Sequence, residues 1–544
     1  MHSIQGIIID PVNRRQFPGN IQIEDGIIKE ITELDQLPDS ARYILPGFVD
    51  AHIHIESSML VPSEFARLAV RHGTVATVSD PHEIANVCGI EGVEFMIENG
   101  KKVPLKFNFG APSCVPATPF ETAGAELDTK AVEKLLERDE IKYLAEMMNW
   151  PGVLNDDPTV MAKIAAARKH GKPVDGHAPG LKGKQAEKYA AAGISTDHEC
   201  FTIEEGRDKL KTGMKIAIRE GSAAKNYNAL IPLLKEAPDR IMFCSDDKHP
   251  DDLLLSHINE LAARTLKLDY DLFDTLRACS VHAVEHYNLD VGLLQPGDPA
   301  DFVITNSIES MEISETWING ECVYRDGNVL FDRIDFEPIN NFVRNDTTPS
   351  DFNIRADGDQ KEIDVQVIVA EDGELITGKE TVSLPVVNRN ILSDQDRDIL
   401  KIAIINRYQK SKPAVGFIKN FGIKNGAIAS SVAHDSHNII AVGSSDEWLS
   451  RVVNEVMKSE GGIAVAGENG TNCVALQVAG IMSDKPGEVI GKAYYELSEM
   501  AKKLGSGLSA PFMTISFMAL LVIPSLKMSD KGLFDGENFE FVEF

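Results

Sequence analysis

The sequence predicts an α/β fold: a (β/α)8 TIM-type barrel, a small β-sandwich domain built from both flanks, and a C-terminal α+β domain. Three observations support this. Eight apolar segments alternate with helical patterns between residues 44 and 290. Short strand-like segments joined by turns lie on both sides of that region, and the pattern changes again after residue 340.

The central region alternates predicted strands with amphipathic helical segments, several of which end in glycine, as helix C-termini often do. Strands that alternate with helices predict a parallel sheet, and eight such units predict a closed barrel. The predicted strands cover residues 44–50, 74–80, 105–110, 141–147, 172–177, 193–199, 214–220 and 240–246.

The flanking segments are typical of β-hairpins. Asp25-Gly26 separates two alternating segments, and Asn319-Gly320 and Asp326-Gly327 mark turns in the later strand-rich region. We therefore predict three domains. They are a small β domain from residues 1–46 plus 291–340, a barrel over residues 47–290, and an α+β domain over residues 350–544.

Composition restricts the possible partners. The 544 residues include 54 Lys and Arg and 83 Asp and Glu, and the net charge of −29 opposes binding to nucleic acid. Seven cysteines without a CxxC pair fit reduced thiols, and the N-terminus has no signal-peptide pattern. The apolar run 517–523 is too short for a membrane helix and is predicted to be a buried strand or helix. We expect a cytoplasmic protein without a membrane partner.

Metal-type ligands occur where the predicted barrel strands end. His52 and His54 are two positions apart in one strand, so both imidazoles face the same side, about 6.6 Å apart along the chain. Each residue alone could be satisfied by local hydrogen bonds. Together they predict a metal site, because active sites of such barrels lie at the C-terminal ends of the strands. The further candidate ligands are Glu146, His177, His198 and Asp246.

The composition of this ligand set indicates the kind of metal. Four imidazoles and two carboxylates without a thiolate suit zinc, manganese or iron. Six ligands are more than one open catalytic ion needs. Two ions about 3.5–4 Å apart would use all six.

Longer motifs resemble a known family. LPGFVDAHIH resembles the opening of the barrel in the amidohydrolase superfamily, and LQPGDPADFVI resembles the return into its small β domain. Many members carry a carboxylated lysine on the fourth strand, where this sequence has Glu146. That departure is similar to the adenine deaminase family, and the resemblance extends from about residue 40 to the end of the chain. It includes HIHIESSML, SDPHEIANV, AEMMN, VDGHAPG, DHEC, SDDK and AHDSHNI.

The resemblance implies hydrolytic deamination of adenine to hypoxanthine and ammonia, a purine salvage reaction, by a metal-activated hydroxide. It also implies two divalent ions, manganese first with iron or zinc as alternatives, and we expect a homo-oligomer, a dimer. Asp246 would serve as general base and then acid. Asp80 or Glu83 would protonate the ring nitrogen, although Asp80 could instead cap the following helix. His82 could orient a ligand.

Two features stay open from the sequence. Arg219 and Glu220, at the seventh strand end, could contact the base. His434 and His437 could form an ordinary turn, or that turn could cover the barrel mouth. The alternative functions are another amidohydrolase, acting on a cyclic amide or a different nucleobase, and a non-enzymatic scaffold. All six expected ligand positions are filled, which argues against a non-enzymatic scaffold.

Overall fold

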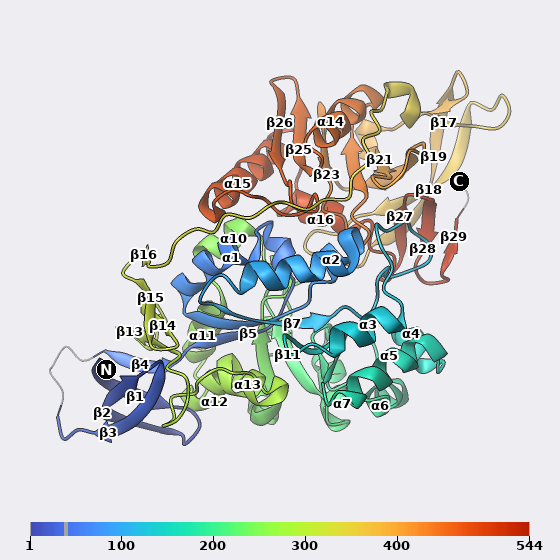
Figure 1. Ribbon diagram of the computed structural model, residues 1–544. Coiled ribbons are helices and arrows are strands. Elements are labelled where there is room, and N and C mark those ends of the chain that lie inside the picture. Colours follow the sequence, from blue (N-terminus) through green and yellow to red (C-terminus); the bar gives the residue numbers. More distant parts are fainter. Residues whose placement is uncertain (1, 37–41, 223, 543–544) are drawn as a thin grey trace.

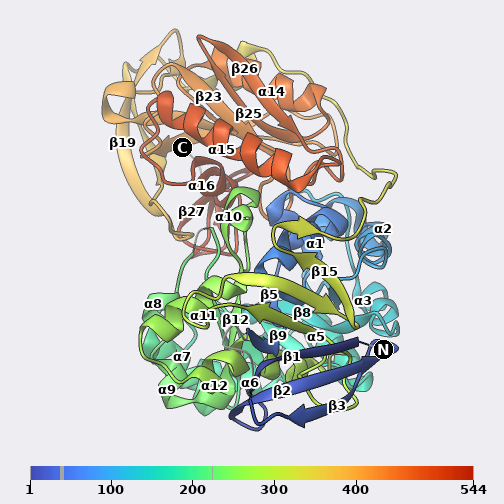
Figure 2. The same ribbon diagram turned by 90° about the vertical axis from the view of Figure 1, so that its left-hand side faces the viewer.

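The computed structural model describes residues 2–36, 42–222 and 224–542. Residues 1, 37–41, 223 and 543–544, which belong to the predicted β domain, barrel and C-terminal domain, lie outside the described residues. Two views at right angles show the barrel with a layer of C-terminal strands and helices lying over one end of it (Figures 1 and 2).

The barrel contains eight parallel strands. Five strands in the order β5-β6-β7-β8-β9 form one sheet and β10-β11-β12 form another. Each predicted strand segment overlaps a barrel strand, although the fifth and sixth strands are short and the first segment also includes most of β4 from the flanking sheet. The strands are β5 Phe48–Ile53, β6 Thr74–Ser79, β7 Lys106–Ala111, β8 Ile141–Met147, β9 Val174–Gly176, β10 Thr196–Asp197, β11 Lys215–Arg219 and β12 Ile241–Cys244.

Hydrogen bonds join the two sheets at both edges. The Ser195 amide donates to the carbonyl of Val174 at 2.9 Å, which joins the β9 and β10 segments. A parallel bridge between Ile53 and Asp246 joins the end of β12 to β5. At this second seam the Asp246 amide donates to the carbonyl of His52 at 2.9 Å. The strand ends that carry candidate ligands therefore also close the barrel.

Helices surround the barrel strands (Figure 1). Most follow a strand directly, as parallel β-α-β connections require. They are α1 Pro62–Ala69, α2 His82–Gly100, α3 Thr129–Leu136, α4 Trp150–Leu154, α5 Pro158–Lys169, α6 Gly183–Ala191, α7 Ile203–Lys211, α8 Tyr227–Leu230, α9 Leu233–Glu236, α10 Pro250–Leu255, α11 Ile258–Lys267, α12 Leu272–Leu276 and α13 His282–Tyr287.

Strands from before and after the barrel share one eight-stranded sheet, in the order β16-β15-β14-β13-β4-β1-β2-β3. In it, β4 pairs in parallel with β1 and antiparallel with β13, so it connects the two halves. The strands are β1 His2–Asp10, β2 Arg15–Glu24, β3 Ile27–Glu33, β4 Tyr43–Pro46, β13 Phe302–Thr305, β14 Ile313–Ile318, β15 Glu321–Arg325 and β16 Asn328–Val329.

The C-terminal region is built on a ten-stranded sheet in the order β17-β20-β19-β18-β22-β21-β24-β23-β25-β26. The apolar run 517–523 is mostly buried, but only its first residue is helical and the rest forms turns. The strands are β17 Ile354–Arg355, β18 Glu362–Val369, β19 Gly378–Val387, β20 Asn390–Ile391, β21 Ile399–Ile405, β22 Ala414–Lys419, β23 Gly426–Ser430, β24 Ile439–Gly443, β25 Gly462–Gly467 and β26 Gly470–Ala475.

Three helices and a small antiparallel sheet complete this region. They are α14 Asp446–Lys458, α15 Gly487–Lys503, α16 Pro511–Phe517, β27 Leu526–Ser529, β28 Gly532–Asp535 and β29 Glu540–Phe541. Among the described residues, no helix is both long and apolar enough to cross a lipid bilayer.

Candidate active site

The six candidate metal ligands converge at the C-terminal end of the barrel. His52 lies in β5 and Glu146 in β8, and the others directly follow β5, β9, β10 and β12. All six are buried. The candidate ligands are His52, His54, Glu146, His177, His198 and Asp246.

Glu146 lies between the four histidines. Its Oε2 is 2.9 Å from Nδ1 of His177 and 3.0 Å from Nε2 of His198. Nε2 of His54 lies 3.6 Å from its Oε1, and Nε2 of His52 lies 3.8 Å from its Oε2. One carboxylate therefore lies close to every imidazole of the cluster, as a central ligand of a metal site would.

Asp246 lies at the seam where the barrel closes and approaches His52 and His54. Its Oδ1 lies 3.2 Å from Nε2 of His54 and 3.6 Å from Nε2 of His52. Nδ1 of His54 lies 3.2 Å from the carbonyl oxygen of Asp80, which can only accept a hydrogen bond. Nδ1 therefore carries a proton, and Nε2 is the nitrogen that faces the carboxylates of the cluster.

Both ligand carboxyl groups are held in the charged form. Burial alone would raise the pKa of Glu146, but charged His177 and hydrogen bonds from His177 and His198 hold that pKa well below its usual range. Burial likewise opposes ionisation of Asp246, and Arg219 with hydrogen bonds from His52 and His54 lowers its pKa instead. The cluster thus combines anionic oxygens with imidazole nitrogens, a donor set that suits a divalent ion.

Arg219 ends β11 and is buried. It pairs through both terminal nitrogens with Glu199, and Nη2 lies 3.0 Å from Oε2 of that carboxylate. Its Nη1 also lies 2.5 Å from Oδ2 of Asp246. Glu220, the neighbour in sequence, pairs with Arg264 and does not line the cavity.

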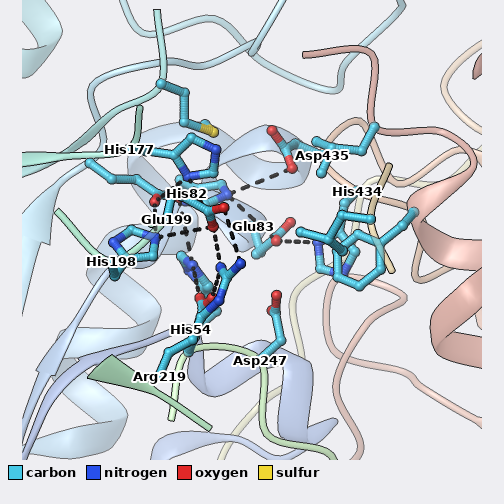
Figure 3. Close-up of a pocket in the computed structure, with 16 residues that line it drawn as sticks. His54, His82, Glu83, His177, His198, Glu199, Arg219, Asp247, His434 and Asp435 are labelled. Carbon is cyan, nitrogen blue, oxygen red and sulfur yellow. Dashed lines mark hydrogen bonds and ion pairs between the residues drawn. The ribbon is translucent and has the colours of Figure 1, made fainter. Parts of the chain in front are cut away.

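One turn of the C-terminal domain contacts the barrel at this site. His434 and His437 lie between β23 and β24, and each donates to one oxygen of Glu83, the second residue of α2. Nδ1 of His437 accepts a hydrogen bond from the amide of Ala433 at 3.2 Å. Its Nε2 therefore carries the proton and donates the hydrogen bond to Glu83. Figure 3 shows His434 facing Glu83 at the edge of the cavity. The turn therefore covers the barrel mouth.

The pKa values in this pair follow from charge proximity. Burial would lower the pKa of His434, but the adjacent Glu83 carboxylate raises it to about 9. Burial opposes ionisation of Glu83, while His434, His437 and His82 hold its pKa well below the usual range. A proton is thus held between His434 and Glu83, next to the cavity.

The cavity is small, with about 30 Å³ open to the centre of a water-sized sphere. Metal-type ligands and other charged groups form one side of it. Met148, Leu375, Phe517 and Leu520 provide apolar walls, and the last three belong to the C-terminal domain. A flat, largely apolar ring with polar edges fits such surroundings.

Comparisons with known proteins agree with this architecture. The profile of the amidohydrolase family matches residues 43–323, and that of the adenine deaminase C-terminal domain matches residues 374–540. The adenine deaminase of Salinibacter ruber is 54% identical over 543 residues, covering 99% of this chain and 98% of that protein. The adenine deaminase of Methanosarcina mazei is 53% identical over 552 residues, covering 100% and 99%. That of Borreliella burgdorferi is 49% identical over 552 residues, covering both chains completely.

The chain belongs to the adenine deaminase family. Its barrel places it among the amidohydrolases, a family that implies a divalent metal, and the buried histidine and carboxylate groups supply matching ligands. The resemblance inferred from the sequence motifs is therefore confirmed.

The remaining residues predicted for the adenine deaminase site lie nearby in different settings. Glu83 lines the cavity, whereas Asp80 does not. Asp80 accepts from the His82 amide at 3.0 Å, and its Oδ2 lies 3.1 Å from Nδ1 of that imidazole. Sequence reasoning missed Glu199, although it follows a predicted ligand at a strand end, a position that could have signalled it.

Asp247 and Asp435 were also missed as lining residues. Asp247 follows a predicted ligand directly, so its position offered a signal. Asp435 lies in the C-terminal domain, and its approach to the barrel depends on tertiary contacts that no local pattern reveals.

Proposed function

We propose that this protein hydrolyses adenine to hypoxanthine and ammonia, as a purine salvage enzyme. One observation carries the proposal: four imidazoles and two carboxylates converge beside a small cavity with apolar walls. Half of the residues are identical to those of adenine deaminases over the full chain length, which supports adenine as the substrate.

His52, His54, Glu146, His177, His198 and Asp246 would hold two divalent ions, with manganese preferred over iron or zinc. Nδ1 of His52 and Nε2 of His177 are buried and have no hydrogen-bond partner, so each imidazole keeps one nitrogen available to a metal ion. Bound divalent ions would lower the pKa of water from about 15.7 towards about 7, which supplies hydroxide at neutral pH.

Asp246 would accept the proton of the attacking water and return it to the departing amine. The water oxygen would join C6 first, and the C6–N bond would then break as ammonia leaves. The remaining hydroxyl proton would return to the acid that protonated the ring nitrogen. Arg219 would keep Asp246 oriented during both transfers.

The ring nitrogen next to C6 needs a proton as electrons move onto it. The proton between His434 and Glu83 lies at the cavity edge and would serve this purpose. Asp80 is the other candidate, and it would act through the His82 imidazole that its carboxylate faces.

We also propose that residues 1–46 with 291–340, residues 47–290 and residues 350–544 act as three domains. A cytoplasmic homodimer stays a prediction, which light scattering on the purified protein and cell fractionation would check.

The decisive experiment measures ammonia release and the loss of adenine absorbance. Protein loaded with manganese should convert adenine to hypoxanthine, and protein stripped with a chelator should not. A Glu146→Gln variant is the matched control, because it removes the central ligand without a large change in volume. If metal-loaded protein ignores adenine, the substrate proposal fails, and cyclic amides and other nucleobases are tested next.

A further inference from the structure

Among the described residues that line the cavity, Asp435 is the carboxylate with a buried oxygen that lacks a hydrogen-bond partner. Glu83, Glu199 and Asp246 each have both oxygens paired, and Oδ1 of Asp247 accepts from Ser57 at 2.5 Å. Oδ2 of Asp435 is buried and has no hydrogen-bond partner. An unpaired buried carboxylate oxygen is costly in a folded protein, so a ligand that supplies a donor is the simplest explanation.

We propose that Asp435 accepts a hydrogen bond from the ring N–H of the purine's five-membered ring, and thereby selects the free base over N9-substituted purines. This inference rests on the proposed function, because it concerns how the same cavity recognises its substrate.

The turn that carries Asp435 is held firmly. The hydroxyl of Tyr408 donates to the carbonyl of Ser436 at 2.5 Å. The side-chain amide of Asn438 donates to the carbonyl of Thr122, in the barrel, at 2.8 Å. The carboxylate is therefore fixed on the cavity wall and does not need to be ordered by the ligand, which favours specific recognition.

His82 fixes the direction from the metal ligands to Asp435. Its Nδ1 lies 3.5 Å from Oε1 of Glu146, and its Nε2 lies 3.8 Å from Oδ1 of Asp435. One imidazole ring thus separates Asp435 from the ligand cluster, and Figure 3 shows Asp435 on the far side of His82 from His54. A base whose C6 lies at the cluster would present another part of its edge to Asp435.

The hydrogen-bond donors of adenine leave only one group that can face Asp435. A carboxylate only accepts hydrogen bonds. Adenine has two kinds of donor: the exocyclic amine, which must face the ligand cluster to react, and the N–H of the five-membered ring. The ring N–H is therefore the partner left for Asp435. A nucleoside lacks that N–H and places a sugar there instead.

The test compares adenine with its 9-oxa analogue, an aminooxazolopyrimidine in which a ring oxygen replaces N9–H without adding bulk. The wild-type protein, loaded with manganese, should prefer adenine in kcat/KM by a factor on the order of 10⁴, as sites built to bond a donor do. In Asp435→Ala this preference should fall to within about tenfold, mainly through loss of activity on adenine. Asp435→Asn should be intermediate, because its carbonyl oxygen still accepts a hydrogen bond.

Metal content and melting temperature are measured for each variant. If Asp435→Ala loses metal or unfolds, Asp435→Asn decides the matter. Wild-type protein that does not deaminate adenine defeats the proposed function itself. Wild-type activity on adenine, combined with unchanged discrimination in the folded variant, overturns the assignment of Asp435 alone.

Discussion

Nη1 of Arg219 lies 2.5 Å from Oδ2 of Asp246, and the same guanidinium forms an ion pair with Glu199. One buried cation therefore compensates two buried carboxylates from neighbouring strand ends. Without it, like charges would face one another in a region where water cannot screen them.

Arg219→Gln should lower the free energy of unfolding by about 3–5 kcal/mol, because it leaves buried carboxylates without their partner. Urea unfolding of the metal-free protein measures this loss. Arg264→Gln breaks the partly exposed pair with Glu220 and should cost at most about 1 kcal/mol. Equal losses in the two variants would contradict the importance of burial.

Glu146→Gln should reduce bound metal more than any single histidine substitution, because Glu146 alone reaches all four imidazoles. Metal analysis of protein purified in added manganese provides the measurement. Asp80→Asn is the matched carboxylate control and should keep its metal. Normal metal content in Glu146→Gln would show that the carboxylate is not a ligand.

Asp80→Asn and Glu83→Gln separate the two candidate acids. Loss of a general acid lowers kcat by about 10²–10⁴-fold. We expect the larger loss in Glu83→Gln, because only Glu83 lines the cavity. Steady-state kinetics with metal content measured in parallel distinguish the roles, and unchanged turnover in either variant removes that residue from the mechanism.

His437→Ala should raise the pKa of Glu83, since burial opposes the charged carboxylate while His434, His437 and His82 favour it. Glu83 would then become protonated at a higher pH than in the wild type. The limb of the kcat profile that follows this group should shift towards higher pH, and kcat should fall about tenfold or more, the effect of losing a hydrogen bond to a charged group. A pH profile of kcat identical to that of the wild type would show that the turn contributes packing but does not tune the pKa of Glu83.

Lys527 is fully buried, and its ammonium donates to the carbonyls of Leu375 at 2.6 Å and Phe517 at 3.0 Å. Burial lowers its pKa to about 7 from 10.5. Between those values the folded state binds fewer protons than the unfolded state, so the stability contributed by this residue rises with pH across the window and is lowest below pH 7.

Urea unfolding of the wild type and Lys527→Met should therefore diverge between pH 7 and 10, with the wild type gaining. Lys209→Met is a useful control, because Asp197 and other partners outweigh burial and raise the pKa of Lys209, so that difference should stay flat in the same range. If the free energies of unfolding of the wild type and Lys527→Met change with pH in parallel, the lowered pKa of Lys527 is disproved.

The sequence could predict that the candidate ligands lie close together, because the strand ends of a parallel barrel meet at one edge, whatever the loops do. The periodicity of a strand placed His52 and His54 on one side, and Glu146 followed from its position late in the fourth predicted strand. The link from Arg219 to Glu199 could not be predicted, since two strand ends had to be positioned to within a hydrogen-bond length.

Long-range contacts limited the prediction in the C-terminal domain. The sequence predicts a strand or helix for the run 517–523, but Phe517 and Leu520 line the cavity from a helix end and the irregular segment after it. An apolar run indicates that its side chains are buried. It does not indicate whether they pack in a hydrophobic core or line a cavity. The choice between an ordinary turn and a cover at His434 and His437 likewise depended on where two domains meet.

The contact between Glu83 and His434 joins residues 351 positions apart in the chain. A ribosome that adds roughly 5–20 residues per second needs about 20–70 s to make that stretch. Throughout that interval the nascent chain lacks His434, and Phe517 and Leu520 of the cavity wall are made later still. Hydrolytic activity on a free base therefore starts only after most of the polypeptide has left the ribosome, so truncated products of translation are expected to be inert.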